Sequence, residues 1–161
     1  MKKMKKLTSL LLVLVMSLAL AVPCFATEPD VPGEVIKEWN TNGFQVQLIK
    51  LDDDAAIIKP RGDLLSDYVY TSNASPRFTW TCCLYPTLRI NIDCTGSSNG
   101  VGCVLTLAGN TFDMGDADAG ERYIITAKRS DGFMSYDFVA AELSLTPRGT
   151  PMYCSVYAWE Q

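Results

Sequence analysis

The sequence predicts a mostly-β protein, an antiparallel β-sandwich or small barrel that forms a single domain after a cleaved signal peptide. Two patterns predict this fold. Short runs alternate apolar and polar residues, as strands with one buried face do, and Gly-, Asn- and Asp-rich turns separate these runs at intervals of about ten residues. The length agrees, because 135 of the 161 residues remain after removal of the predicted signal peptide, which is the size of one domain.

Residues 1–26 have the three parts of a secretory signal peptide. Four lysines without an acid open the chain, an uninterrupted apolar stretch follows, and Ala26 is a small residue suited to cleavage before Thr27. The apolar stretch ends at Pro23 and is shorter than the roughly 20 residues of a membrane anchor. Cys24 raises the alternative of a lipoprotein, but proline is a poor residue before an acylated cysteine. We therefore expect a secreted, extracellular protein of a bacterial exporter, with no stable membrane insertion after cleavage.

The charge of the mature chain argues against nucleic acid as a partner. The full sequence has 14 basic residues, 18 acidic residues and no histidine. Removal of the signal peptide takes away four lysines and no acid, which leaves a net charge of −8. The longest basic run of the mature chain is Lys128-Arg129, which is too short to attract a phosphate backbone or an anionic membrane surface. We therefore expect an acidic protein that binds neither.

The mature chain is expected to begin with a flexible leader and one hairpin. Residues 27–34 contain two prolines and three acids, a composition typical of a solvated segment, so we place the β-rich domain at residues 35–161. Two alternating runs, 35–39 and 44–48, flank Asn42-Gly43, and both turn residues tolerate the positive φ of a tight hairpin turn. We therefore expect these two runs to pair as a hairpin.

The strand pattern is most regular from residue 78 onwards. After a first strand that begins at Phe78, predicted strands follow at residues 88–94, 103–107, 122–127, 133–145 and 152–159. A helix is the alternative for residues 136–143, because the run FVAAEL contains good helix formers. That segment has no helix-capping residues, so we favour a strand there.

A second hairpin is expected to bring Cys94 opposite Cys103. In this register Ile92 lies opposite Leu105, and a slip by one residue would turn the apolar side chains of one strand to solvent. Both sulfur atoms then lie on one buried face, so the sequence predicts a Cys94–Cys103 disulfide. Closing so short a loop stabilises a fold by about 2.5 kcal/mol on the chain-entropy model.

Five cysteines remain after removal of the signal peptide, so at least one has no partner within the chain. Cys82 shares a strand face with Phe78 and is expected to point into the core, whereas Cys83 lies on the wetter face. We predict a Cys83–Cys154 disulfide that ties the last strand to the domain. Cys82 is the alternative partner of Cys154. If Cys83 forms the bridge, Cys82 remains a free thiol in the core. The odd number also allows a covalent dimer.

The residue types argue against a catalytic site. The absence of histidine excludes the usual Ser-His and Cys-His nucleophile systems, and the cysteine spacing fits neither a zinc site nor a C-x-x-C motif. A pair of carboxylates could still catalyse hydrolysis, and the candidates are Asp113, Asp116, Asp118, Glu121 and residues 52–54. Asp116 and Asp118 also have the spacing of calcium ligands, but the positions that follow break the EF-hand pattern. Acids of this kind gather in turns, so we expect no enzyme, no metal and no cofactor.

The last predicted strand carries an aromatic face. Tyr153, Tyr157 and Trp159 alternate there with small or apolar residues, so they all point to one side of the sheet. If that side is exposed, it forms a platform on which sugar rings can stack; otherwise the aromatic residues fill the core. We expect a secreted, non-catalytic module that binds an extracellular glycan or protein. The alternatives are a small secreted hydrolase with an Asp/Glu pair, or a secreted inhibitor or effector.

Overall fold

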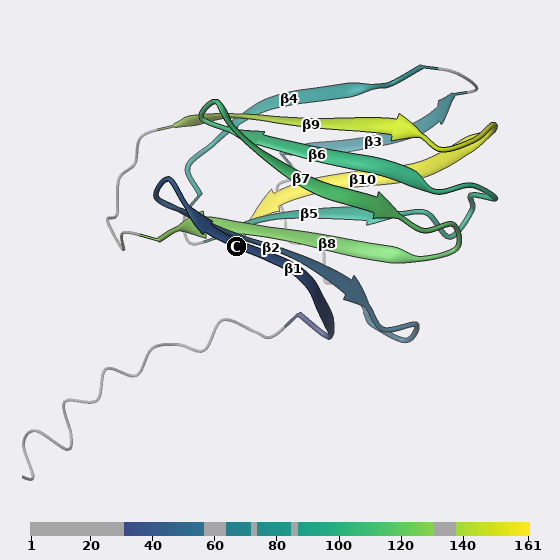
Figure 1. Ribbon diagram of the computed structural model, residues 1–161, viewed down its shortest axis with the longest axis horizontal. Helices are drawn as coiled ribbons and strands as arrows, with labels where there is room; N and C mark the ends of the chain where they lie inside the picture. The colour runs from purple at the N-terminus through teal and green to yellow at the C-terminus, as the bar shows by residue number, and fades with distance from the viewer. Residues whose placement is uncertain (1–30, 57–63, 72–73, 85–86, 131–137) are drawn as a thin grey trace, which may run out of the picture. The chain divides into compact units, whose positions relative to one another are not determined.

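The computed structural model describes residues 31–56, 64–71, 74–84, 87–130 and 138–161, so the predicted signal peptide lies outside the described residues. Within these ranges the chain forms two antiparallel sheets, and the predicted β-sandwich is confirmed (Figure 1). The strands are β1 (Gly33–Thr41), β2 (Phe44–Leu51), β3 (Leu65–Thr71), β4 (Arg77–Cys82), β5 (Leu88–Asp93), β6 (Val101–Leu107), β7 (Asn110–Ala117), β8 (Arg122–Arg129), β9 (Val139–Pro147) and β10 (Met152–Glu160). No helix of the described residues is long and apolar enough to span a membrane.

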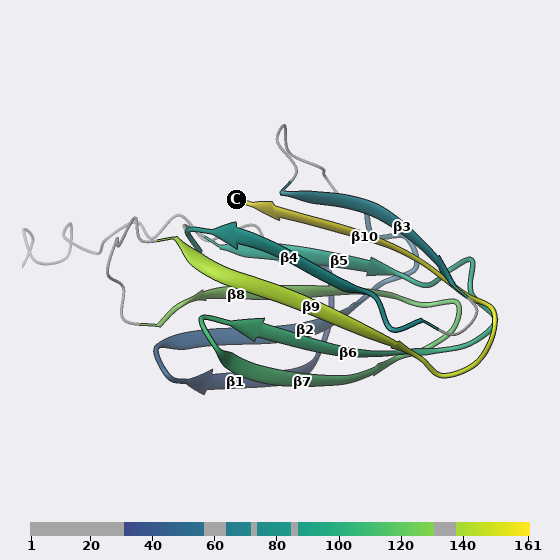
Figure 2. The ribbon, with the colours of Figure 1, turned by 90° about the horizontal axis from the view of Figure 1, so that it is seen from above.

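The two sheets pack against each other around the main hydrophobic core (Figures 1 and 2). The large sheet has six strands in the order β1-β2-β8-β5-β10-β3, and the small sheet has four in the order β4-β9-β6-β7. Alternate residues of most strands face the core, and β10 directs Met152, Cys154, Val156 and Ala158 into it. Burying a valine or methionine side chain of this kind contributes about 1.5–3 kcal/mol, so the inward faces are the main source of stability.

The first predicted hairpin is confirmed. β1 pairs with β2, and Thr41 lies opposite Phe44, so Asn42 and Gly43 form a two-residue turn. Both residues have a positive φ, 53° for Asn42 and 79° for Gly43, which is the conformation that this sequence pair favours. The domain begins slightly earlier than predicted, because β1 starts at Gly33 within the predicted leader.

The segment for which a helix was the alternative is a strand from Val139 onwards. β9 pairs with β4 on one side and with β6 on the other, so it is a central strand of the small sheet. The earlier part of the predicted strand, residues 133–137, lies outside the described residues.

The predicted hairpin between residues 88–94 and 103–107 is wrong. β5 pairs with β8 and β10 in the large sheet, whereas β6 pairs with β7 and β9 in the small sheet. Ile92 and Leu105 do face one core, but they face it from opposite sheets. Alternation shows which face of a strand is buried, and it does not show which strand lies beside it.

Arg122, the first residue of β8, binds the segment 52–55 that follows β2. Its guanidinium donates to the backbone carbonyls of Asp52, Asp53 and Ala55 at 2.8, 2.7 and 3.0 Å. Ala55 belongs to a second hydrophobic cluster with Ile124 and Trp159. Because the neighbours of Ile124 and Trp159 along their strands face the main core, this second cluster lies on the outer face of the large sheet.

We expect Arg122→Ala to lower the free energy of unfolding by about 1–3 kcal/mol, because three backbone carbonyls lose a charged donor. Arg77→Ala is the matched control, since the Arg77 side chain is 71% exposed and makes an ion pair worth less than about 1 kcal/mol. Urea denaturation followed by tryptophan fluorescence measures both. Equal losses in the two variants would contradict the role given to Arg122.

Candidate functional site

The predicted aromatic residues of β10 lie on the outer face of the large sheet. Tyr153, Tyr157 and Trp159 alternate with residues of the main core, as the sequence indicates. Their exposure differs, however: Tyr153 is 39% exposed, whereas Trp159 is only 2% exposed. Trp159 is therefore not available for stacking on a ligand in this structure.

The second hydrophobic cluster explains why Trp159 is buried although it faces away from the main core. Its buried members are Ile49, Leu51, Ala55, Ile124 and Trp159, with Tyr157 packed against them. The indole thus belongs to a structural layer on the outer face of the large sheet. Among the described side chains of β10, Tyr153 is the aromatic residue that this face presents most openly.

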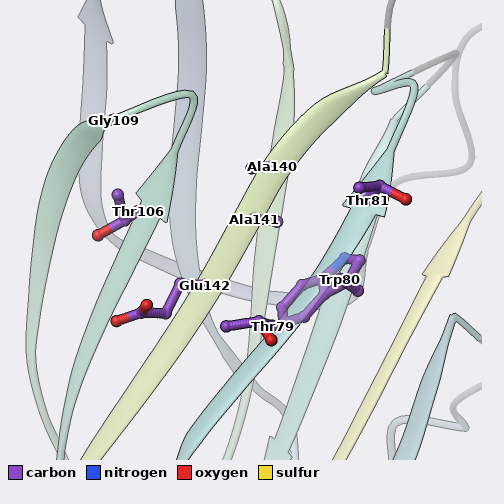
Figure 3. Close-up of a pocket in the computed structure, with 8 residues that line it drawn as sticks. All are labelled: Thr79, Trp80, Thr81, Thr106, Gly109, Ala140, Ala141 and Glu142. Atoms are coloured by element: carbon purple, nitrogen blue, oxygen red, sulfur yellow. The ribbon is translucent and has the colours of Figure 1, made fainter.

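An open groove of about 550 Å³ lies on the other side of the sandwich, on the outer face of the small sheet (Figure 3). Its walls are formed by β4, by β9, and by the end of β6 with the turn that leads into β7. Its lining consists of Thr79, Trp80, Thr81, Thr106, Gly109, Ala140, Ala141 and Glu142. Most of these side chains are small or polar, in contrast to the apolar inner face of the same sheet.

The register of the small sheet aligns three of the lining residues in one row. Thr79 on β4 lies opposite Glu142 on β9, and Glu142 lies opposite Thr106 on β6. Figure 3 shows the Glu142 side chain extending from β9 towards Thr106. Thr111 on β7 continues the row, with its hydroxyl oxygen 3.4 Å from that of Thr106. The row thus places one threonine on each side of the Glu142 carboxylate and a third beyond Thr106, and each hydroxyl can donate and accept a hydrogen bond.

Small residues beside this row keep the groove open. Ala140 lies opposite Thr81 and is exposed to solvent, and Gly109 lies in the turn after β6. Trp80 lines the groove while it packs against the main core, and its indole N–H is buried without a hydrogen-bond partner among the described residues. The groove therefore combines a hollow floor with hydroxyl groups, and Trp80 lies beside it.

Glu142 is oriented by two neighbours. Its Oε1 accepts a hydrogen bond from the Ser144 hydroxyl at 3.0 Å and lies 3.7 Å from a guanidinium nitrogen of Arg77. Both contacts engage Oε1, so Oε2 is the oxygen that a ligand can approach. Among the described residues that line the groove, Glu142 is the single carboxylate.

Four of the acidic residues considered for hydrolysis or calcium binding have partners within the fold. Asp113 accepts from the Gly115 N–H, Asp116 pairs with Arg148, Asp118 accepts from the Tyr123 hydroxyl, and Glu121 pairs with Lys50. In the part of the chain that the structure describes, no group of three or more His, Cys, Asp or Glu side chains could hold a metal ion. These contacts give the four carboxylates a structural role.

Cys82 and Cys83 point to different sides at the end of β4, as the sequence indicates. Cys82 faces the main core, where burial and the nearby Glu160 carboxylate raise the pKa of its thiol to about 12. Cys83 is partly exposed, and its backbone N–H donates to Oε1 of Glu160 at 2.6 Å. All five cysteines of the described chain carry free thiols, so neither predicted bridge is formed in this structure.

We expect alkylation of the folded protein at pH 8 to modify Cys83 at least about tenfold faster than Cys82, because a thiol with a pKa far above the pH holds little thiolate. Iodoacetamide labelling followed by fragmentation of the peptide that carries both cysteines measures the two rates. In Cys83→Ser the fast reaction should disappear. A fast reaction that persists in this variant would contradict the assignment.

Sequence reasoning did not single out the groove. Alternation along β4 does place Thr79 and Thr81 on the solvent side, but Thr79 aligns with Glu142 and Thr106 only because β9 pairs with both β4 and β6. A threonine on either side of Trp80 was the signal that the sequence offered.

Comparison with known proteins gives no family for this chain, since no protein-family model, no curated protein and no solved structure matches it. The chemistry of the groove is therefore the basis on which a function is proposed.

Proposed function

We propose that the chain is a secreted, non-catalytic β-sandwich module that binds an extracellular glycan in the groove of the small sheet. The observation that carries the proposal is the row of Thr79, Glu142 and Thr106 across three neighbouring strands. The signal-like residues 1–26 support export, and the net charge supports a ligand other than nucleic acid.

Glycan chemistry matches the residues of the groove. A sugar presents neighbouring hydroxyl groups, and a carboxylate such as Glu142 accepts hydrogen bonds from two of them at once. Thr79 and Thr106 supply hydroxyls that donate or accept as the sugar requires. The residues stand on paired strands, so the site is largely formed before a ligand arrives, which lowers the entropic cost of binding. A protein ligand is the other partner class that the sequence left open, but apart from Trp80 the described residues that line the groove are small or polar, whereas large anchors dominate protein interfaces.

The hydrolase alternative has weaker support. Hydrolysis of a glycosidic bond needs two carboxylates flanking the scissile bond, whereas the described part of the lining contributes one, Glu142. Asp113 and Asp116, the acids first considered for catalysis, are engaged elsewhere on the surface. No specific observation favours an inhibitor or effector.

A glycan array tests the proposal with two matched variants. Glu142→Gln removes the negative charge in the groove, and Glu38→Gln makes the same change on the exposed strand β1. Losing a charge-assisted hydrogen bond costs about 1.5–3 kcal/mol, so we expect Glu142→Gln to weaken binding about tenfold to a hundredfold. Glu38→Gln should bind like the unmodified chain.

Two results would contradict the proposal. One is the absence of any bound glycan on an array of bacterial, plant and animal oligosaccharides. The other is equal binding by the unmodified chain and by Glu142→Gln, together with a loss on Tyr153→Ala, which would move the site to the outer face of the large sheet.

A further inference from the structure

Three thiols meet inside the sandwich at the end where β5 stops and β6 starts. Cys94 follows β5 directly, Cys154 lies on β10, and Cys103 lies on β6 in the small sheet. Cys94 and Cys154 are 0% exposed and Cys103 is 3% exposed, and all three belong to the main core. Three buried cysteines from both sheets therefore share one region of the core.

Cys94 and Cys154 form the close pair within this group. β5 and β10 are antiparallel neighbours in which Asp93 lies opposite Ser155, and the same register continued by one residue puts Cys94 opposite Cys154. Their sulfur atoms lie 3.7 Å apart. Residues directly opposite on antiparallel strands have Cα atoms about 4.5–5.5 Å apart, which is within the range of about 4.4–6.8 Å that disulfides span. Side-chain rotation is thus sufficient to bring the two sulfurs to bonding distance.

The surroundings favour this pair over the other combinations. The Cys103 thiol donates to the Val101 carbonyl of its own strand at 3.5 Å. Cys83 contacts Glu160, six residues beyond Cys154 on β10, which corresponds to about 20 Å along an extended strand. The contact with Cys154 lowers the pKa of the Cys94 thiol, whereas the same contact and burial raise the pKa of Cys154.

We propose that Cys94 and Cys154 are a disulfide-forming dithiol, oxidised by a disulfide reagent of the glutathione class, and that their bridge joins the central strands β5 and β10. The proposal does not rest on the groove or on its ligand. It replaces the Cys94–Cys103 and Cys83–Cys154 bridges expected from the sequence, and it leaves Cys82, Cys83 and Cys103 as thiols.

The chemistry is two thiol–disulfide exchanges. The Cys94 thiolate attacks one sulfur of oxidised glutathione, which forms a mixed disulfide and releases one glutathione thiolate. The Cys154 thiolate then attacks the Cys94 sulfur, closes the protein disulfide and releases the second glutathione. Two protein thiols lose two protons and two electrons, and one oxidised glutathione gains them. Because both cysteines are fully buried in the folded chain, the first exchange takes place before the core closes.

Refolding of the full chain tests the proposal directly. The chain is unfolded, reduced, and refolded with reduced and oxidised glutathione, and free thiols are then alkylated in denaturant before digestion with trypsin. Trypsin cleaves after Arg89, Arg122 and Arg148, so Cys94 and Cys103 share the peptide 90–122 and Cys154 lies in 149–161. We expect these two peptides to be linked until a reductant is added.

Two cysteine variants assign the bridge to Cys94. Cys103→Ala should give the same linked peptides, whereas Cys94→Ala should give none and leave Cys154 alkylated. Cys82→Ala is the control for loss of a core cysteine outside the pair. A loop closed within peptide 90–122, a link that survives in Cys94→Ala, or alkylation of every cysteine after refolding would each overturn the proposal. If Cys94→Ala does not refold, the Cys103→Ala variant is sufficient to assign the bridge. In that variant Cys94 is the one cysteine of peptide 90–122, so a link to peptide 149–161 must come from Cys94.

Discussion

Reduction of the Cys94–Cys154 bridge is expected to lower the free energy of unfolding by about 4 kcal/mol. The two residues are 60 positions apart, and a cross-link that closes a loop of this length removes about that much chain entropy from the unfolded state on the chain-entropy model. This is a large fraction of the about 5–15 kcal/mol by which small domains are stable. The midpoint of urea unfolding, measured with and without a reductant, gives the difference.

The Cys82→Ala variant separates the bridge from core packing. Loss of its buried thiol lowers stability in both redox states, but the difference between oxidised and reduced protein should stay at about 4 kcal/mol. In Cys154→Ala the reductant should change nothing. Equal stability of the oxidised and reduced unmodified chain would contradict the expected effect.

Replacement of Trp159 by alanine is expected to lower the free energy of unfolding by about 3–5 kcal/mol, the usual range for a buried tryptophan. Trp159 is 2% exposed and packs with Ile49, Leu51 and Ile124, so its removal leaves a cavity under the segment that Arg122 holds. Tyr153→Ala on the same face of the same strand should cost less than about 1 kcal/mol, because Tyr153 is 39% exposed.

Trp159→Phe refines this prediction. The indole N–H of Trp159 is buried and has no hydrogen-bond partner among the described residues. A buried donor without a partner lowers the free energy of unfolding. Phenylalanine keeps much of the ring and removes that donor, so we expect a loss clearly smaller than that of Trp159→Ala. Thermal and urea unfolding of the three variants measure the series. A Trp159→Ala protein as stable as Tyr153→Ala would contradict the structural role of Trp159.

Local sequence patterns were sufficient for the fold class and for the first hairpin. Asn42-Gly43 specifies its own turn, because both residues adopt the positive φ that a two-residue hairpin requires. Alternation along β4 also placed Cys82 in the core. These predictions succeed because each depends on residues that are neighbours in the chain.

Predictions that depend on the pairing of distant strands failed for a physical reason. Ile92 and Leu105 both point into the core, and a hairpin and a sandwich of two sheets satisfy that pattern equally well. The sequence of β10 alone does not show that residues of β2, β8 and the segment after β2 bury Trp159 on the outer face of the large sheet. This is why Trp159 was a candidate for an exposed platform. The adjacent apolar pairs Leu48-Ile49 and Ile124-Ile125 were the signal that β2 and β8 are buried on both faces.

The candidate site was beyond sequence reasoning for the same reason. Thr79, Thr106 and Glu142 come from three strands that are separated along the chain, and only the register of β9 against both β4 and β6 aligns them. No local sequence motif predicts such a row. Once the strand order and register are known, the three residues are seen to lie side by side.

The most direct test of the central claim, that the groove of the small sheet is the ligand site, is to fill it. Ala140 is exposed on the groove floor, so Ala140→Trp should occupy the hollow without disturbing the core, and Ala119→Trp makes the same change at an exposed turn elsewhere. On a glycan array we expect Ala119→Trp to bind like the unmodified chain and Ala140→Trp to lose binding. Unchanged binding by Ala140→Trp would contradict the account.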